Sequence, residues 1–184
     1  AIIRGDGGGK PQGLLNATAT VSVAKETGQG AATLTADNVL KMYARMWAPS
    51  ASRASFYINQ GLFPQLTKMY IPAGTGGLPI YVPPGMTLAN APHGTLFGRP
   101  VEIIEQADAP GTVGDIIFAD LGEYGVIDKG GVEAATSIHV KFLEDEMVFR
   151  FIMGVDGQSM WPNKLTPFKG ADTISPFVTL ATRA

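Results

Sequence analysis

The stretch that decides the fold is Leu96-Phe97-Gly98-Arg99-Pro100-Val101, followed by Gly114-Asp115-Ile116-Ile117-Phe118-Ala119-Asp120-Leu121 and then by Tyr124-Gly125-Val126-Ile127. Each segment contains a short apolar run bounded by Gly, Pro or Asp, which is typical of short strands. We therefore predict core strands over residues 101–105, 115–119 and 124–128. The 184 residues include 23 Gly and 13 Pro, so we expect many short elements and turns instead of a helical bundle.

Two helices and a strand are predicted before these segments. Thr35 can cap a helix over residues 35–47, whose apolar residues recur at the spacing of one helical face. Asn59 can cap a second helix over residues 59–69, and residues 55–58 between the helices fit a strand. The chain thus combines helices and strands in an α+β arrangement. The residues expected on the apolar face of the first helix are Val39, Leu40, Tyr43, Met46 and Trp47.

Two other segments lack a regular pattern. Residues 17–34 are small, polar and β-branched, and we expect them to be extended and poorly buried. Residues 72–95 contain five prolines and five glycines and are predicted to form a long loop. A loop of this length in a compact domain is usually functional or packs against a partner.

The C-terminal third predicts a long hairpin and a last strand. Apolar residues alternate over residues 138–142 and again over 147–152, and the acidic tripeptide Glu144-Asp145-Glu146 lies between these arms. The second arm is apolar on both faces apart from Arg150. Such a strand needs cover on both sides, from its own chain or from a neighbouring subunit. Residues 177–180 fit a final short strand.

The composition excludes several classes of function. Cysteine is absent, so disulfides, thiolate nucleophiles and cysteine-bound zinc are excluded. The 14 Lys and Arg against 16 Asp and Glu give a formal net charge of −2, which does not provide the basic face that nucleic acids need. No apolar run approaches the roughly 18 residues that span a bilayer.

The candidate motifs for chemistry are weak. Residues 5–11 (GDGGGKP) resemble a phosphate-binding loop, but Pro11 stands where Ser or Thr is required. His93 and His139 lie far apart without metal-ligand spacing, so neither a metal nor a cofactor is predicted. The acids that could act in acid–base catalysis sit beside glycines or at strand ends, where Asp usually closes turns; they are Asp115, Asp120, Glu123, Asp128 and Asp156.

In order along the chain, several of these motifs resemble the major capsid proteins of the Hong Kong 97 phage type. The Gly-Asp-Gly turn at residues 5–7 is followed by Pro11-Gln12-Gly13-Leu14-Leu15, as in that family. The segments over residues 96–101, 114–121 and 124–127 are similar to its most specific signatures. Gly154-Val155-Asp156-Gly157 and the last strand complete the match, which extends over residues 5–180.

The resemblance implies a shell-forming structural protein and not an enzyme. It implies a central axial domain over residues 14–132, with a mixed sheet and flanking helices, and a peripheral part built from 1–13 and 133–184. The family's N-terminal arm, extended loop and spine helix precede the Gly-Asp-Gly turn, so we expect them to lie outside this sequence. An encapsulin-like compartment and a gene-transfer particle are alternatives within the same fold. A hydrolytic or small-ligand-binding α+β domain that uses Asp115 and Asp120 is the alternative from another class.

The resemblance also implies the partners. Copies of the chain would form hexamers and pentamers in a virion shell that is assembled in the bacterial cytoplasm. The shell would enclose DNA without gripping it strongly, and scaffold, portal or decoration proteins would be further partners. No membrane is implied. The candidate contact residues come from the 72–95 loop and the hairpin; they are Pro72, Tyr81, Pro83, Pro84, His93, Glu144, Asp145, Glu146, Phe149 and Phe151.

Overall fold

A mixed seven-stranded sheet forms the body of the molecule in the computed structural model, which describes residues 1–73, 76–85 and 93–183. Two neighbouring pairs, β1–β13 and β2–β7, are parallel, and the other pairs are antiparallel. The predicted mixed-sheet α+β fold is therefore confirmed. In spatial order the strands are β1 (Val21–Val23), β13 (Phe177–Leu180), β8 (Ile116–Ala119), β2 (Ser55–Ile58), β7 (Arg99–Ile103), β6 (Gly94–Leu96) and β5 (Tyr81–Val82).

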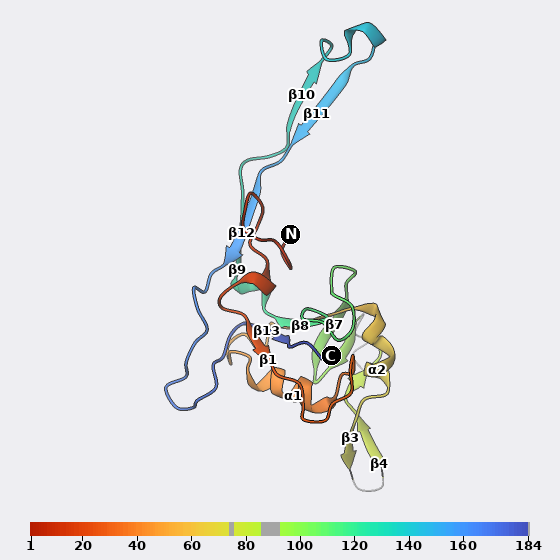
Figure 1. Ribbon diagram of the computed structural model, residues 1–184, viewed down its shortest axis with the longest axis vertical. Coiled ribbons are helices and arrows are strands. Elements are labelled where there is room, and N and C mark those ends of the chain that lie inside the picture. The colour runs from red at the N-terminus through yellow and green to blue at the C-terminus, as the bar shows by residue number, and fades with distance from the viewer. Residues whose placement is uncertain (74–75, 86–92, 184) are drawn as a thin grey trace.

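The central strand β8 is buried on both faces, which explains its uninterrupted apolar sequence. Ile116 and Phe118 face a core that contains residues of both helices, and Phe118 stacks on Phe56 of β2 with ring centroids 4.1 Å apart. Ile117 and Ala119 face a second, smaller core, which includes Leu14. The second core is covered by the N-terminal segment, which contains a 3₁₀ turn over Leu14–Asn16, instead of by an α-helix (Figure 1).

The turn of the deciding segment lies between β6 and β7. Phe97 and Gly98 occupy the two loop positions with φ angles of +49° and +74°. Two-residue hairpin loops of this kind need positive φ at both positions, which a glycine adopts easily and a phenylalanine only at some cost. Phe97 packs against the larger core, and this contact compensates for the unfavourable backbone angle.

The helix α1 (Ala36–Ala44) begins at the predicted cap. The Asn38 amide donates to Thr35 Oγ1 at 3.4 Å, and the Thr35 amide donates to Asn38 Oδ1 at 3.1 Å, which together form a capping box. The helix ends before the predicted residue 47, and its buried residues are Asn38, Val39 and Met42. Met46 is also buried, but it lies beyond the end of the helix. The predicted face was partly wrong, because Leu40 is 43% exposed. Tyr43 is partly exposed, but its ring stacks on Phe118 with centroids 5.5 Å apart.

Replacing Thr35 by Ala is expected to lower the free energy of unfolding by about 1 kcal/mol, because the Asn38 amide at the start of α1 loses its side-chain acceptor and Asn38 Oδ1 loses the Thr35 hydroxyl. Thr35→Ser keeps the hydroxyl and should cost much less. Urea unfolding followed by circular dichroism measures both variants. Equal losses for Ala and Ser would contradict a capping role.

The second helix is shorter than predicted. Asn59 accepts a hydrogen bond from the Gly61 amide at 2.8 Å and caps a 3₁₀ turn over Gln60–Leu62, which continues into α2 (Phe63–Thr67). Pro64 lies in the first turn of α2, where its missing N–H costs nothing. The strands β2 and β13 have their predicted bounds, whereas β7 begins two residues earlier and β8 one residue later than expected.

Two segments predicted to be irregular contain strands. Residues 17–34 include β1 (Val21–Val23), and Ala19, Val21 and Val23 are buried, so the expectation of poor burial was wrong. The long loop predicted over 72–95 is also partly wrong. It holds part of the hairpin β3 (Tyr70–Ala73) and β4 (Gly76–Pro79), together with β5 and the start of β6.

A long arm projects from this body (Figure 1). At its base β9 (Tyr124–Asp128) pairs with β12 (Val155–Ser159), and further out β10 (Glu133–Ser137) pairs with β11 (Val148–Ile152). We call residues 124–159 the projecting arm. The prediction that residues 124–128 form a core strand was wrong, because only Tyr124 of β9 is buried. β13 lies in the central sheet, between β1 and β8. It was predicted to belong to the peripheral part, within residues 133–184.

The outer hairpin has a different register from the predicted one. β11 pairs with residues 133–137, with Phe149 opposite Thr136 and Phe151 opposite Ala134. The residues predicted as the first arm, 138–142, instead form part of the loop that closes the hairpin. We call residues 138–147 the tip loop; it contains a 3₁₀ turn over Phe142–Glu144.

Candidate assembly surfaces

The projecting arm exposes apolar side chains along its outer half. Phe149 and Phe151 lie on one face of β11, with exposed fractions of 61% and 69%, and Met153 continues the row at 59%. Their cross-strand partners Ala134 and Thr136 are too small to cover them. An isolated two-stranded hairpin is marginal in water, so an apolar face of this extent is typical of a surface that another chain covers.

The tip loop is both acidic and apolar. Lys141 Nζ forms ion pairs with Glu144 Oε2 at 2.9 Å and with Glu146 Oε2 at 2.6 Å. These two carboxylates, Glu146 first, raise the pKa of the Lys141 ammonium group. Phe142 and Leu143 are 73% and 98% exposed, so the loop presents two large apolar side chains to solvent.

The candidates from the 72–95 segment divide into core and surface residues. Tyr81 is buried, its ring lies edge-on to Phe63 at 5.9 Å, and burial raises the pKa of its hydroxyl. It is therefore a core residue. Pro84 and His93 are exposed, and they line with Tyr81 a cavity of about 480 Å³. Pro83 is half-buried, and the side chain of Pro72 lies outside what the structure describes.

The two acids of the hydrolytic alternative lie at opposite ends of β8. The strand rises by about 3.3 Å per residue, so Asp115 and Asp120 are separated by roughly 16 Å. Pairs of catalytic carboxylates lie roughly 5 to 9.5 Å apart. Each acid also has a structural partner, so the arrangement provides no acid–base pair.

Asp115 forms a fully buried ion pair with Arg183, and both side chains have no exposed surface. Asp115 Oδ2 also accepts a hydrogen bond from the Gly111 amide at 2.9 Å, as the prediction of a turn-forming role requires. Arg183 Nε donates to the Thr33 carbonyl at 2.6 Å. The pair therefore fastens the C-terminal residues to two loops of the body. No local sequence pattern indicates a contact between residues 68 positions apart.

Asp120 fastens the base of the projecting arm to the body. Its Oδ2 accepts hydrogen bonds from Arg53 Nε and Nη2 at 3.0 and 2.8 Å, and its Oδ1 accepts from the Gly122 amide at 3.0 Å. Arg53 also binds Glu123, which accepts from Trp161 Nε1 at 3.0 Å. Burial alone would raise the pKa of Asp120, but its hydrogen bonds and the Arg53 charge outweigh this and lower the pKa.

This lowered pKa predicts a pH dependence. Because the folded-state pKa of Asp120 lies below its unfolded value of about 4, the ionised group stabilises the fold at neutral pH. That contribution shrinks as the pH falls through the folded-state pKa. We expect Asp120→Asn to destabilise the protein at pH 7, and to cost progressively less as the pH is lowered below about 4, as measured by urea unfolding. A cost independent of pH would contradict this role for the carboxylate.

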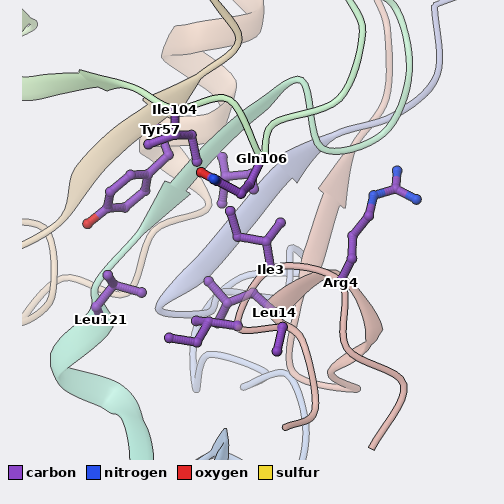
Figure 2. Close-up of a pocket in the computed structure, with 10 residues that line it drawn as sticks. Ile3, Arg4, Leu14, Tyr57, Ile104, Gln106 and Leu121 are labelled. Carbon is purple, nitrogen blue, oxygen red and sulfur yellow. The ribbon is translucent and has the colours of Figure 1, made fainter. Parts of the chain in front are cut away.

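An apolar cavity of about 590 Å³ lies beside the N-terminal residues. Figure 2 shows Ile3 between Ile104 and Leu14, with Tyr57 and Leu121 at one side and the Arg4 side chain directed away. Arg4 instead binds Asp108. No carboxylate is among the described residues that line this cavity, so it offers no acid–base chemistry.

A third exposed surface was not found from the sequence. Leu165 and Ile174 exchange backbone hydrogen bonds at 3.0 and 2.9 Å and close the loop between them. We call residues 164–173 the Phe168 loop, after Phe168, whose side chain is fully exposed. A single apolar residue in a polar segment gives no periodic signal, so the sequence alone did not indicate it.

The described residues contain neither a membrane-spanning helix nor a cluster of metal ligands. Within residues 1–73, 76–85 and 93–183, no helix is long and apolar enough to cross a membrane. In this same part of the chain no three His, Asp or Glu side chains gather as metal ligands would. The notable features are thus exposed apolar surfaces and structural ion pairs.

Comparison with known proteins gives a consistent result. The model of the phage capsid family matches residues 1–170. The solved capsid of a native GTA (gene transfer agent) particle is similar to the whole chain, with a TM-score of 0.68 and 22% identity, and that of an empty GTA particle has a TM-score of 0.65 and 20% identity. Both were computed with C5 symmetry.

These capsids share the fold of the chain but are longer. Each alignment covers 100% of this chain and 60% of the other, so the chain spans about three fifths of the length of these capsid proteins. A comparison with curated proteins gave no match. The likeness confirms the Hong Kong 97-type fold that the sequence motifs indicated. Because the family model extends over nearly all of the sequence, the chain belongs to the phage capsid family.

Proposed function

We propose that this chain is a shell-forming subunit of a tailed-phage, prophage or gene-transfer-particle capsid, and that copies of it assemble into rings within a closed shell. The observation that carries the proposal is the projecting arm, whose row of phenylalanines is left mostly exposed by the described residues. An arm with such a face suits burial against neighbouring copies. The family match and the fold support a structural role for the protein.

The proposal assigns a role to each exposed surface. The arm meets neighbouring subunits, and Pro83, Pro84 and His93 lie near the ring axis. Residues 14–123 together with β13 form the central part, and the projecting arm forms the peripheral part. The assembled shell encloses DNA in the virion after assembly in the bacterial cytoplasm. Scaffold, portal and decoration proteins would bind the completed rings or shell.

Among the alternatives within this fold, the likeness to the two GTA capsids favours a gene-transfer particle over an encapsulin-like compartment. The hydrolytic alternative has less support, because Asp115 and Asp120 are separated by the length of β8 and each is held by an arginine. Nothing favours small-ligand binding beyond the apolar cavity beside Ile3.

Sedimentation of the product of the complete gene tests the proposal. A shell subunit will sediment as particles of megadalton size or as rings of five or six copies, at concentrations where an ordinary domain is monomeric. The same sample should show no change in this distribution after nuclease treatment, because the shell does not depend on DNA. A monomer at all concentrations would contradict the proposal.

A further inference from the structure

Two surfaces that lie far apart on the molecule have opposite charge, and both present fully exposed apolar side chains. The tip loop lies at the far end of the projecting arm, whereas the Phe168 loop extends from the body (Figure 1). Within residues 138–147 there are one Lys and three acids, a net charge of −2 with His139 neutral. Within the Phe168 loop there are two Lys and one acid, Asp172, a net charge of +1, and Asp172 already pairs with Arg45 of the body.

We propose that the tip loop of one copy docks on the Phe168 loop of a second copy, with Leu143 against Phe168 and the tip carboxylates facing Lys164 and Lys169. This rests on the proposed assembly of the chain into a shell. Because the two surfaces are different and lie far apart on one subunit, the contact is head-to-tail. Such contacts continue from copy to copy and close into rings when the rotation permits.

Several contacts fix the base of the Phe168 loop, while the Phe168 side chain extends into solvent. Its base is closed by the Leu165–Ile174 hydrogen bonds, and Arg45 Nη2 donates to Thr173 Oγ1 at 2.7 Å. Arg45 Nη1 also pairs with Asp172 at 3.5 Å. A loop fixed by these contacts presents a fully exposed Phe168, as expected for an anchor residue that fills a pocket on a partner.

The tip loop offers a matching surface. Leu143 is 98% exposed between Phe142 and the acidic residues, and Lys141 holds Glu144 and Glu146 in place. Asp145 adds a third carboxylate on a backbone with a φ angle of +53°. In contrast, Lys164 and Lys169 form no ion pair within the described residues, so both remain available to a partner. The opposite charges favour this pairing and disfavour a tip against a tip.

Reversing charges in the complete protein tests whether the tip carboxylates attract Lys164 and Lys169 of a second copy. Glu144→Lys with Glu146→Lys changes the tip from −2 to +2, and Lys164→Glu with Lys169→Glu changes the Phe168 loop from +1 to −3. Each pair alone should raise the concentration needed for assembly by about tenfold or more. The fourfold variant, in which both surfaces are reversed, should recover assembly. As a control, Glu105→Lys with Lys68→Glu exchanges charge at two exposed positions of the body and should change nothing.

Cysteine crosslinking tests the contact directly, because the chain has no cysteine of its own. In assembled particles, Leu143→Cys with Phe168→Cys should form disulfides that give a ladder of multimers on a non-reducing gel. Leu143→Cys with Leu78→Cys, in which Leu78 is exposed on β4, should stay monomeric on that gel. Dimers from Leu143→Cys alone would show that tips meet tips, and would overturn the inference.

A failure of the head-to-tail contact can be distinguished from a failure of shell assembly. If the unmodified protein forms no particles, the proposed function fails, and the inference fails with it. If particles form but the Leu143 and Phe168 positions do not link, or if the fourfold variant does not recover, the head-to-tail contact is wrong and the proposed function stands.

Discussion

Replacing Arg183 by Ala is expected to lower the free energy of unfolding by about 3–5 kcal/mol. The change leaves the carboxylate of Asp115 buried without its counter-charge, and Oδ1 of this group already lacks a partner among the described residues. It also removes the bond from the guanidinium to the Thr33 carbonyl. Chemical unfolding monitored by tryptophan fluorescence measures the loss.

Two variants show whether the cost comes from the unpaired charge. Arg183→Met with Asp115→Asn removes both charges, and should destabilise the protein less than Arg183→Ala alone, because neither buried charge is left. Arg150→Ala removes an exposed arginine on the arm and should change the stability by about 0.5 kcal/mol or less. A loss below about 1 kcal/mol for Arg183→Ala would contradict the structural role of the pair.

Replacing both Phe149 and Phe151 by Ser should abolish shell assembly without destabilising the body. The two rings are 61% and 69% exposed and belong to neither core, so the isolated subunit loses little. At an interface each ring should contribute about 1.4 kcal/mol or more, so the concentration needed for assembly should rise by about 100-fold or more. Light scattering follows assembly, and thermal unfolding reports the stability of the body.

Phe149→Leu with Phe151→Leu is the matched control. Leucine keeps most of the apolar surface, so this variant should assemble at a concentration close to that of the unmodified protein. If the serine variant assembles equally well, the phenylalanine face is not an interface. If it loses its thermal stability instead, the rings support the fold and not the assembly.

Much of the body could be predicted because its signals are local. Thr35 and Asn59 cap their helices as predicted, because an N-cap depends only on the next few residues. The strands over 55–58 and 177–180 have their predicted bounds, because Asn59 follows the first apolar run and Pro176 precedes the second. The order of the motifs from Gly5 onward also identified the fold, which no single segment did.

The arm was harder to predict for a physical reason. Residues 138–142 alternate as a strand does, yet β11 pairs with residues 133–137, whose small and polar side chains give little signal. Alternation shows which residues share a face, but it does not fix the register of a pair. That register here depends on the length of the tip loop, which the pattern did not reveal.

Contacts between distant residues were also beyond the sequence. The pairing of Asp115 with Arg183 follows from the position of the C-terminal residues beside the 111–115 loop, which only the assembled sheet creates. Tyr81 and Phe149 are both aromatic residues that were predicted as contact residues. The ring of Tyr81 lies in the core, whereas the ring of Phe149 is exposed. Their difference arises from the topology of the sheet.

Electron cryo-microscopy of the purified product of the complete gene tests the central claim most directly. The account predicts closed shells whose subunits show the seven-stranded sheet, with the projecting arm of each copy buried against a neighbour. Monodisperse single subunits with the arm free in solvent, at concentrations where phage-like shells form, would contradict it.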